Sequence, residues 1–288
     1  MSFINRINLK LNSIFCFSDV KFCKCKYYKY NNKKLNLENP SEFMEKIQWL
    51  KLNFYKEEYG CYVDKFEVRK YVANKIGEKY LNPIYGVFDS FKDIDFSILP
   101  EKFIIKGTHG SGMNILVVDK SKIDLSKIEK KIKTFLKTEY FKVNREYVYK
   151  KLKPRIVVEE LIDSGNEQLK DYKFYCFSGV PKYVLVKTSI NGVEKKCFYD
   201  LNWTKICQEK ITKDYFEHEF EKPDNFNEMI DVATKLSEGF IFIRVDLYSH
   251  NNSVIFGELT FFPMGGMKRL KMEKLNKEMG DAIQLPFQ

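Results

Sequence analysis

Charged residues alternate with apolar ones near the C-terminal end of the sequence, in a spacing that gathers charge on one face of a sheet. Arg244 and Asp246 are two positions apart in one strand-like run, and Glu258 and Thr260 are two apart in the next. Side chains two apart on a strand share a face, so a hairpin would bring these pairs close together. Two carboxylates beside a guanidinium among apolar neighbours are costly to bury without a compensating ligand.

The ligand that suits this group is magnesium carried by nucleotide phosphates. Magnesium prefers hard oxygen donors and usually takes only one or two carboxylates from the protein, while phosphate oxygens and water complete its shell. Asp246 and Glu258 are therefore candidate metal ligands. A cross-strand salt bridge between Arg244 and one acid is the structural alternative, and such a bridge contributes little to stability.

A glycine-rich segment follows Lys106 and predicts a loop that can hold phosphate. Gly107, Gly110 and Gly112 follow the lysine closely, so backbone amides can approach phosphate oxygens while the ammonium neutralises their charge. The segment lacks the G-K-[ST] ending of a Walker A motif and the G-x-G-x-x-G spacing of a dinucleotide fingerprint. An ordinary glycine-rich hairpin turn is the alternative.

Two glutamates close another strand-like run. Glu159 and Glu160 end the sequence RIVVEE and precede Leu161. A glutamate at a strand end can accept hydrogen bonds from a ribose, and the adjoining backbone can read an adenine edge. Two solvated acids are the structural alternative.

These residues need a framework of strands, and hydrophobic periodicity predicts one from about residue 102 onward. Short apolar or alternating runs predict strands at 102–106, 115–118, 155–159, 172–177, 182–186, 241–248 and 253–261. The turn-forming residues from Ser249 to Asn252 predict a hairpin between the last two. Helices are predicted over 124–140 and from Asn225 to about Gly239. Because the strands do not alternate regularly with helices, the predicted fold class is α+β.

The first 95 residues predict a mainly helical region. One helix is capped by Asn39, with Glu42 at the capping-box position. A second helix is capped by Asp64 and stops at Gly77.

Composition excludes several classes of protein. The 288 residues are 44% hydrophobic, enough for a globular core, and no apolar run approaches the roughly 20 residues that span a bilayer. The net charge of +10 comes from lysines scattered along the chain, so no basic stripe marks a nucleic-acid partner. Seven cysteines without a C-x-x-C pair or a secretion signal predict reduced thiols. We therefore expect a cytoplasmic protein without a transmembrane segment.

The order of these runs resembles an ATP-grasp domain, in particular the TupA-like group associated with bacterial surface polysaccharides. The resemblance rests on FIIKGTHGSGMNI, RIVVEELI, LKDYKFYCFSG, FIRVDLY and FGELTFFPMGGM, and upstream on VDKFEVRKYVANKIGEKYLNPIYGV. It spans roughly residues 40 to 268. It implies two α+β subdomains, 96–160 and 161–288, that clasp a nucleotide after the helical region 1–95.

The resemblance also implies roles for individual residues. Arg244 is similar to the family's γ-phosphate arginine, and with Lys106 it is the expected catalytic pair. The expected ATP-binding residues are Lys65, Lys106, Gly110, Ser111, Gly112, Glu159, Glu160, Lys173 and Arg244. Asp246, Glu258 and Thr260 are the expected magnesium ligands. Thr260 departs from the asparagine that many relatives carry as a further metal ligand.

The activity implied is that of an ATP- and magnesium-dependent ligase, which converts a carboxylate into an acyl phosphate that an amine attacks. The expected partners are a uronic-acid polysaccharide or sugar-nucleotide-derived acceptor and a small amine or amino acid. The expected location is the cytoplasm or, alternatively, the periphery of the inner membrane beside polysaccharide machinery. Loop 107–112 is the expected lid, with His109 and Ser111 as phosphate contacts. A kinase acting on a sugar hydroxyl and a glycosyltransferase are the alternatives.

Overall fold

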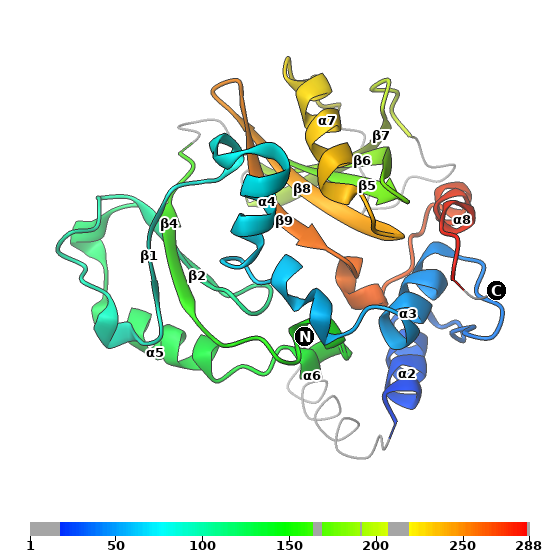
Figure 1. Ribbon diagram of the computed structural model, residues 1–288, viewed down its shortest axis with the longest axis horizontal. Helices are drawn as coiled ribbons and strands as arrows, with labels where there is room; N and C mark the ends of the chain where they lie inside the picture. The colour runs from blue at the N-terminus through cyan, green and yellow to red at the C-terminus, as the bar shows by residue number, and fades with distance from the viewer. Residues whose placement is uncertain (1–17, 164–168, 191, 207–218, 287–288) are drawn as a thin grey trace. The chain divides into compact units, whose positions relative to one another are not determined.

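The computed structural model describes residues 18–163, 169–190, 192–206 and 219–286 (Figure 1). The chain forms two compact units, each built from segments that are distant in the sequence. The helical unit comprises Met1–Lys56, Phe141–Tyr147 and Phe262–Gln288. The two-sheet unit comprises Glu57–Tyr140 and Val148–Phe261. The predicted subdomains 96–160 and 161–288 are a separate division of the chain and remain a prediction.

The two-sheet unit contains a four-stranded antiparallel sheet with the strand order β1, β4, β2, β3. Its strands are β1 (Ile84–Phe88), β2 (Phe103–Gly107), β3 (Asn114–Val117) and β4 (Ile156–Glu160). The apolar runs predict β2, β3 and β4. Strand β1 was not predicted, because it is short, follows Pro83 and has Gly86 at its centre.

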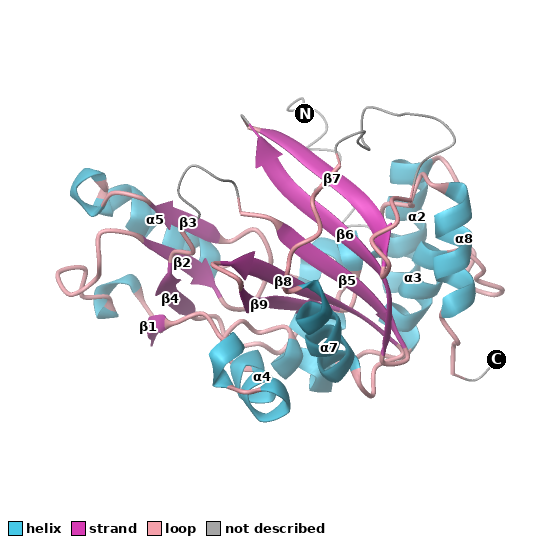
Figure 2. Cartoon of the chain, turned by 90° about the horizontal axis from the view of Figure 1, so that it is seen from above, coloured by secondary structure: helices cyan, strands magenta, loops and turns pink. Residues whose placement is uncertain are grey.

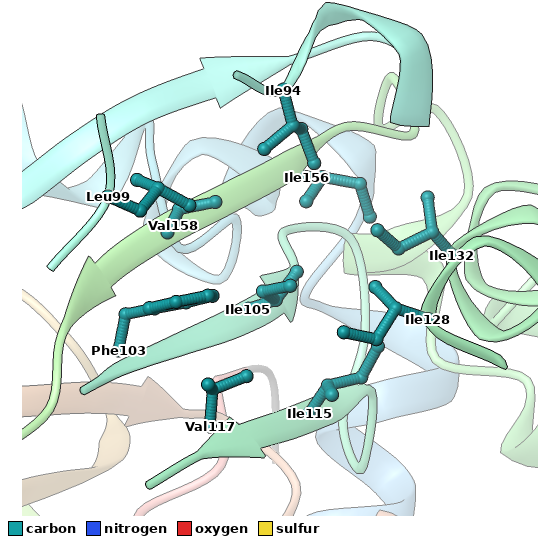
Figure 3. Close-up of a cluster of buried hydrophobic side chains, with 10 residues drawn as sticks. All are labelled: Ile94, Leu99, Phe103, Ile105, Ile115, Val117, Ile128, Ile132, Ile156 and Val158. Atoms are coloured by element: carbon teal, nitrogen blue, oxygen red, sulfur yellow. The ribbon is translucent and has the colours of Figure 1, made fainter. Parts of the chain in front are cut away.

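One face of this sheet forms a hydrophobic core with helix α5, Leu125–Leu136 (Figure 3). Asp124 begins the helix, since its side chain accepts the Lys127 N–H at 3.0 Å. The helix contributes two isoleucines one turn apart, and the strands and the connection between β1 and β2 contribute the other residues. The buried members of the cluster are Ile94, Leu99, Phe103, Ile105, Ile115, Val117, Ile128, Ile132, Ile156 and Val158.

The second sheet has five antiparallel strands in the order β7, β6, β5, β8, β9 (Figure 2). Its strands are β5 (Asp171–Phe177), β6 (Val180–Ile190), β7 (Val193–Asp200), β8 (Phe242–His250) and β9 (Ser253–Thr260). Helix α7, Phe226–Ser237, packs against β5, β6 and β8. It follows Asn225, as predicted.

The predicted hairpin between β8 and β9 is confirmed. Asn251 and Asn252 form its turn with φ angles of 48° and 57°. Positive φ at both central residues is what a tight two-residue hairpin requires, and asparagine tolerates this conformation better than most residues.

Helix α4, Val68–Ile76, packs against α7 in the same unit. Gly77, with φ 101°, ends it at the predicted position. Asp64 accepts the N–H groups of Phe66 and Glu67 at 2.9 and 3.0 Å. Asp64 therefore caps the turn that leads into the helix, as predicted, although the regular helix begins only at Val68.

The helical unit is made of α2 (Asp19–Asn31), α3 (Phe43–Asn53), α6 (Phe141–Asn144) and α8 (Glu273–Ala282). Short 3₁₀ helices in the two units are η1 (Glu57–Tyr62), η2 (Glu78–Tyr80), η3 (Phe91–Asp93), η4 (Lys120–Lys122), η5 (Tyr147–Tyr149) and η6 (Pro263–Gly266). Helix α3 packs against α2, α8 and η6. The buried Lys51 ammonium donates to the carbonyls of Asn144 and Gly265, each at 2.8 Å, so one side chain joins three segments of the unit.

Helix α3 begins later than Asn39, the predicted cap. The amide of Asn39 donates to the Asn36 side chain at 3.0 Å, which holds the chain in a turn. Glu42 is the N-cap residue and forms a capping box with Glu45. A turn-forming asparagine three residues upstream thus displaced the start of the helix.

No described helix is long and apolar enough to cross a membrane. The described cysteines are free, and they are Cys23, Cys25, Cys61, Cys176 and Cys197. Cys16 and Cys207 lie outside the described residues.

Close packing of α8 on the start of α3 yields a stability prediction. A Cβ at Gly280 would lie 2.3 Å from the Ser41 carbonyl oxygen and 3.0 Å from the Phe43 nitrogen. We expect Gly280→Ala to lower the free energy of unfolding by about 1–3 kcal/mol, as overpacking does. Urea denaturation measures it, and Lys277→Ala on the exposed side of α8 should change it by less than about 0.5 kcal/mol. A more stable Gly280→Ala variant, the outcome helix propensity alone favours by up to about 1 kcal/mol, would show that the contact is absent.

Candidate active site

A cavity of about 440 Å³ lies within the two-sheet unit and is lined by residues of both sheets. Its volume falls in the roughly 300–1,000 Å³ range of small-molecule sites. On β2, Phe103 and Ile105 enter the apolar core, and the alternate residues Ile104 and Lys106 line the cavity. The period of two therefore divides the sheet into a core face and a cavity face.

The register of the five-stranded sheet sets charged side chains side by side across neighbouring strands. Asp246 on β8 pairs with Lys173 on β5 and with Glu258 on β9. Arg244 pairs with Thr260 in the adjoining row. Directly paired residues point to the same face of a sheet, so the predicted approach of these two pairs is confirmed.

Arg244 is the centre of this group. Its Nε and Nη2 donate to the two carboxylate oxygens of Asp246 at 2.6 and 2.7 Å. Nη2 also donates to Glu258 Oε1 at 3.2 Å and to the Thr260 hydroxyl at 3.1 Å. Both carboxylates thus lie within hydrogen-bonding reach of one guanidinium nitrogen.

Asp246 remains ionised although it is only 1% exposed. Burial alone raises the pKa of a carboxyl group, but Arg244 and Lys173 outweigh that effect and lower the pKa of Asp246 below its ordinary value. The Lys173 ammonium lies 2.5 Å from Asp246 Oδ2 and 2.5 Å from Asp171 Oδ2. Lys173 therefore bridges two acids, one of which, Asp171, sequence reasoning did not select.

Two further lysines line the cavity. Lys106 forms an ion pair of 2.7 Å with Glu159, and Lys65 donates to the Gly110 carbonyl. Burial lowers the pKa of Lys65, and the nearby carboxylate of Glu258 opposes that shift. Glu160 lines the cavity and is more exposed than Glu159.

The glycine-rich loop contributes fewer residues to the cavity lining than the sequence predicts. Ser111 and Gly112 line the cavity, and Gly112 has φ 74° with open space where a Cβ would lie. Gly110 instead packs against Met113 and Tyr140, since a Cβ there would approach them within 2.4 and 2.8 Å.

His109 is not a phosphate contact in this arrangement. It is 3% exposed, and its Nε2 lies 3.0 Å from the Phe135 carbonyl at the end of α5. Burial also lowers its pKa, which disfavours a positive charge near neutrality. The expectation that His109 touches phosphate is therefore wrong.

Nine of the predicted site residues line the cavity together, namely Lys65, Lys106, Ser111, Gly112, Glu159, Glu160, Lys173, Asp246 and Glu258. Arg244 and Thr260 join them through hydrogen bonds. Their roles toward ATP and magnesium stay predictions. Lining residues missed by the sequence reasoning include Arg69, Asn82, Asp171, Lys187 and Tyr248. Asp171 had a signal, because it stands two positions before Lys173, the spacing that separates Arg244 from Asp246.

Asp246 and Glu258 fit magnesium only as two ligands of a coordination shell that phosphate oxygens complete. In the described ranges, no three Asp, Glu, His or Cys side chains converge on a metal position. Asp246 and Glu258 are nevertheless neighbours on one face, and the described hydrogen bonds of Glu258 all fall on Oε1. Two hard donors that leave room for phosphate oxygens match the way magnesium accompanies nucleotides.

The two-sheet unit thus contains a cavity lined by lysines and acids and adjoined by one arginine, a composition suited to anionic ligands. The chain belongs to the TupA-like ATP-grasp family, because the family model described as TupA-like ATPgrasp matches residues 45–284. This membership confirms the predicted α+β ATP-grasp fold.

Among solved structures, the chain is similar to D-alanine–D-alanine ligase from Bacillus anthracis complexed with ATP, with 13% identity and a TM-score of 0.46 over 78% of this chain and 64% of that chain. The D-alanine–D-alanine ligase from Helicobacter pylori has 13% sequence identity and a TM-score of 0.43. The match covers 85% of this chain and 70% of that chain. The ATP-grasp ligase PsnB complexed with its minimal precursor has 10% sequence identity and a TM-score of 0.44. The match covers 82% of this chain and 65% of that chain. The chain thus spans less than two thirds of the length of the first and third of these proteins. No curated protein sequence matches it.

Breaking the ion pair at the centre of the site should destabilise the two-sheet unit. Arg244→Met leaves the buried Asp246 with Lys173 alone, and loss of a buried partner typically costs about 3–5 kcal/mol. Adding Asp246→Asn removes the uncompensated charge. The double variant should therefore lose less free energy of unfolding than the sum of the losses in the single variants Arg244→Met and Asp246→Asn.

Urea denaturation of the native protein, the two single variants and the double variant tests this coupling. Lys187→Met, which breaks a half-exposed pair with Glu194 on the same sheet, should cost less than about 1 kcal/mol. Strictly additive losses at Arg244 and Asp246 would contradict the structural account.

Proposed function

We propose that this chain is an ATP- and magnesium-dependent ligase that joins a carboxylate to an amine through an acyl phosphate. The observation that carries the proposal is the composition of the cavity wall. Lys65, Lys106 and Lys173 line it, and Arg244 adjoins them through Asp246. Several fixed cations around one small cavity suit a triphosphate, whose transfer develops charge on the phosphoryl oxygens.

Each cation on this wall is already oriented by an acid or a carbonyl. Lys106 is held by Glu159 at 2.7 Å and Lys173 by Asp171 at 2.5 Å. Their side chains are 23% and 13% exposed, so both are restrained yet can be reached from the cavity. Preorganised charges of this kind stabilise a transition state without reorienting during the reaction.

Asp246 and Glu258 are the residues that would hold magnesium, with phosphate oxygens completing its shell. When bound, the ion would neutralise phosphate charge and polarise the γ-phosphoryl group. The Thr260 hydroxyl donates to Glu258 at 3.2 Å and accepts from Arg244 at 3.1 Å. The hydroxyl would therefore orient both neighbours beside the proposed metal position.

The proposed reaction has two steps. A carboxylate oxygen of the acceptor attacks the γ-phosphorus of ATP. The bond between the γ-phosphorus and the oxygen of the β-phosphate breaks, and ADP leaves. The amine nitrogen then attacks the acyl carbon, inorganic phosphate leaves, and the nitrogen loses a proton. Lys106, Lys173 and Arg244 would hold the phosphates through both steps, and loop 107–112 would exclude water from the acyl phosphate.

The proposed substrates are a uronic-acid polysaccharide, or an acceptor derived from a sugar nucleotide, and a small amine or amino acid. This substrate class is supported by the family's resemblance to enzymes of surface polysaccharides and thus by analogy. The cavity's cations support the anionic nature of one substrate, because they would attract its carboxylate as well as the nucleotide.

The activity is tested by incubating the protein with ATP, magnesium, a glucuronic-acid glycoside and a panel of amines. We expect ADP and phosphate in equal amounts, and a product heavier than the acid by the amine minus water. Lys106→Ala should reduce the rate by about 10²–10³, the usual loss for one preorganised contact. Lys102→Ala is the matched control, because Lys102 is half exposed and pairs with Asp163 outside the cavity.

Two results would refute the ligase assignment. A phosphorylated sugar that persists in the presence of amines would identify a kinase. Release of UDP from a UDP-sugar without ATP would identify a glycosyltransferase.

A change at the proposed metal ligands should appear as a changed magnesium requirement. Glu258→Gln replaces a carboxylate by a weaker amide donor, so the magnesium concentration for half-maximal rate should rise about tenfold or more. Glu258 is the better site for this test because its side chain is 40% exposed, so the fold should persist. Glu194→Gln on β7 is the control. An unchanged magnesium titration for Glu258→Gln would remove Glu258 from the metal site.

A further inference from the structure

Helix α2 of the helical unit packs against α3 with one of its sides (Figure 1). The residues of this inner side, Phe22, Cys23 and Tyr27, are at most 9% exposed. Lys26 also turns inward, where its ammonium donates to Asn144 Oδ1 at 2.8 Å. The opposite side of the helix faces solvent.

The outer face of α2 comprises Val20, Lys21, Lys24, Tyr28 and Lys29, which are all exposed. Lys21, Lys24 and Tyr28 follow one another at spacings of three and four residues, so their side chains lie along one side of the helix. The outer face of α2 is therefore a strip of lysines that includes an aromatic and an aliphatic residue.

Positive charge is in excess on this helix. Its 13 residues contain four lysines and a single acid, Asp19. That acid is already neutralised, because Arg145 Nε lies 3.0 Å from its Oδ1. Lys268 adds a further charge beside the end of the helix, with its ammonium 5.8 Å from the centre of the Tyr30 ring. Positive charges gathered on one exposed face attract an anionic partner.

The apolar members of the outer face of α2 indicate what kind of anion fits it. Tyr28 is 51% exposed and Val20 is 42% exposed. A soluble polyanion offers partners for the lysines but none for Val20, whereas a lipid bilayer offers anionic headgroups above an apolar layer. Tyrosine suits that boundary because its ring is apolar and its hydroxyl is polar. Lysine suits it too, since its methylene chain lies along apolar surface while the ammonium stays among the headgroups.

The sequence before the helix has the same composition. Residues 1–17, outside the described part of the chain, contain Arg6 and Lys10, no acid, and apolar residues such as Phe3 and Ile4. Attachment to a membrane surface draws on both terms, because apolar contact and attraction to anionic lipids add together.

We propose that the outer face of α2 binds the chain peripherally to the surface of an anionic lipid bilayer. Its lysines lie among the phosphate headgroups, and Tyr28 and Val20 reach the boundary of the acyl chains. The helix lies on the surface and does not cross it, because its 13 residues are too few to span a bilayer. The inference is independent of the proposed ligase activity, and it gives the expected location at a membrane periphery a defined contact surface.

Sedimentation of the full chain with vesicles tests the proposal. The vesicles contain phosphatidylcholine alone, or phosphatidylcholine and phosphatidylglycerol in equal parts. We expect the chain to bind the anionic vesicles and to remain in solution with the neutral ones. Raising the salt from about 0.1 M to about 1 M should release it, since the screening length falls from about 10 Å to about 3 Å.

Charge-neutral variants locate the contact on α2. Each lysine beside an anionic membrane corresponds to a factor of about five in affinity, so Lys21→Gln with Lys24→Gln should weaken binding to the anionic vesicles about 25-fold. Lys274→Gln with Lys277→Gln is the matched control, because these exposed lysines of α8 pair with acids one turn away. It makes the same change in net charge and should change the affinity less than about threefold. Equal melting temperatures of the variants and the native chain show that the fold persists.

A parallel titration with polygalacturonate, a soluble uronic-acid polymer, separates a membrane from a polyanion. Tyr28→Ala should weaken binding to the anionic vesicles at least about threefold, because it removes exposed apolar surface, and should leave any binding of the polymer unchanged. If the polymer binds as tightly as the vesicles, and Tyr28→Ala alters neither, the outer face of α2 is a polyanion site and the proposal is wrong.

Three further outcomes would overturn the proposal. Equal losses in the α2 and α8 double variants would show that net charge alone drives the binding. Equal binding to neutral and anionic vesicles would remove the lysines from the contact. A native chain that binds neither kind of vesicle would refute membrane attachment outright, and none of these results depends on turnover of ATP.

Discussion

The ion pair between Arg244 and Asp246 is the interaction on which the candidate site depends. Asp246 is almost entirely buried, and a carboxylate in that position persists only if cations offset its charge. Arg244 supplies a two-point contact, and Lys173 adds a third. Because Arg244 also contacts Glu258 and Thr260, the same guanidinium sets the positions of the proposed metal ligands.

This charge is tolerated because each sheet separates its two faces. One face of the four-stranded sheet packs with α5 through Ile105, Ile115, Val117, Ile156 and Val158, and the five-stranded sheet packs against α7. The cavity faces can therefore carry paired charges without disturbing either apolar core. The rows of Lys173, Asp246 and Glu258 exist only in one antiparallel register, since a slip of one residue would turn every charge toward the core.

Much of this could be read from the sequence, because alternation with a period of two is a local property. The shared face of Arg244 and Asp246, the β8–β9 hairpin and the end of α4 at Gly77 follow from neighbouring residues alone. The missed features depend on partners far along the chain or on short strands. His109 turns away from the cavity because the end of α5 offers a carbonyl, and no local pattern reveals that.

The edge strand β7 was missed for a different reason. Its sequence VEKKCFYD has three charged residues directly after the first valine, and charged residues are common where a strand has only one neighbour. Asp171 lies one residue before the predicted strand 172–177, and its ion pair with Lys173 is seen only in the three-dimensional arrangement. The local sequence pattern thus predicts the face of the sheet on which a residue lies. Its hydrogen-bond and ion-pair partners are found only in the three-dimensional structure.

Lys51 has a consequence for the order in which the protein is completed during synthesis. Its buried ammonium needs the carbonyls of Asn144 and Gly265, and the second belongs to a segment that leaves the ribosome long after α3. At about 5–20 residues per second, the delay is on the order of ten seconds or more. The helical unit contains the first described helices, yet it is finished only after the strands of the two-sheet unit have been translated. Until then α3 exposes the surface that α8 later covers, so a nascent chain carries uncovered apolar surface at this early helix.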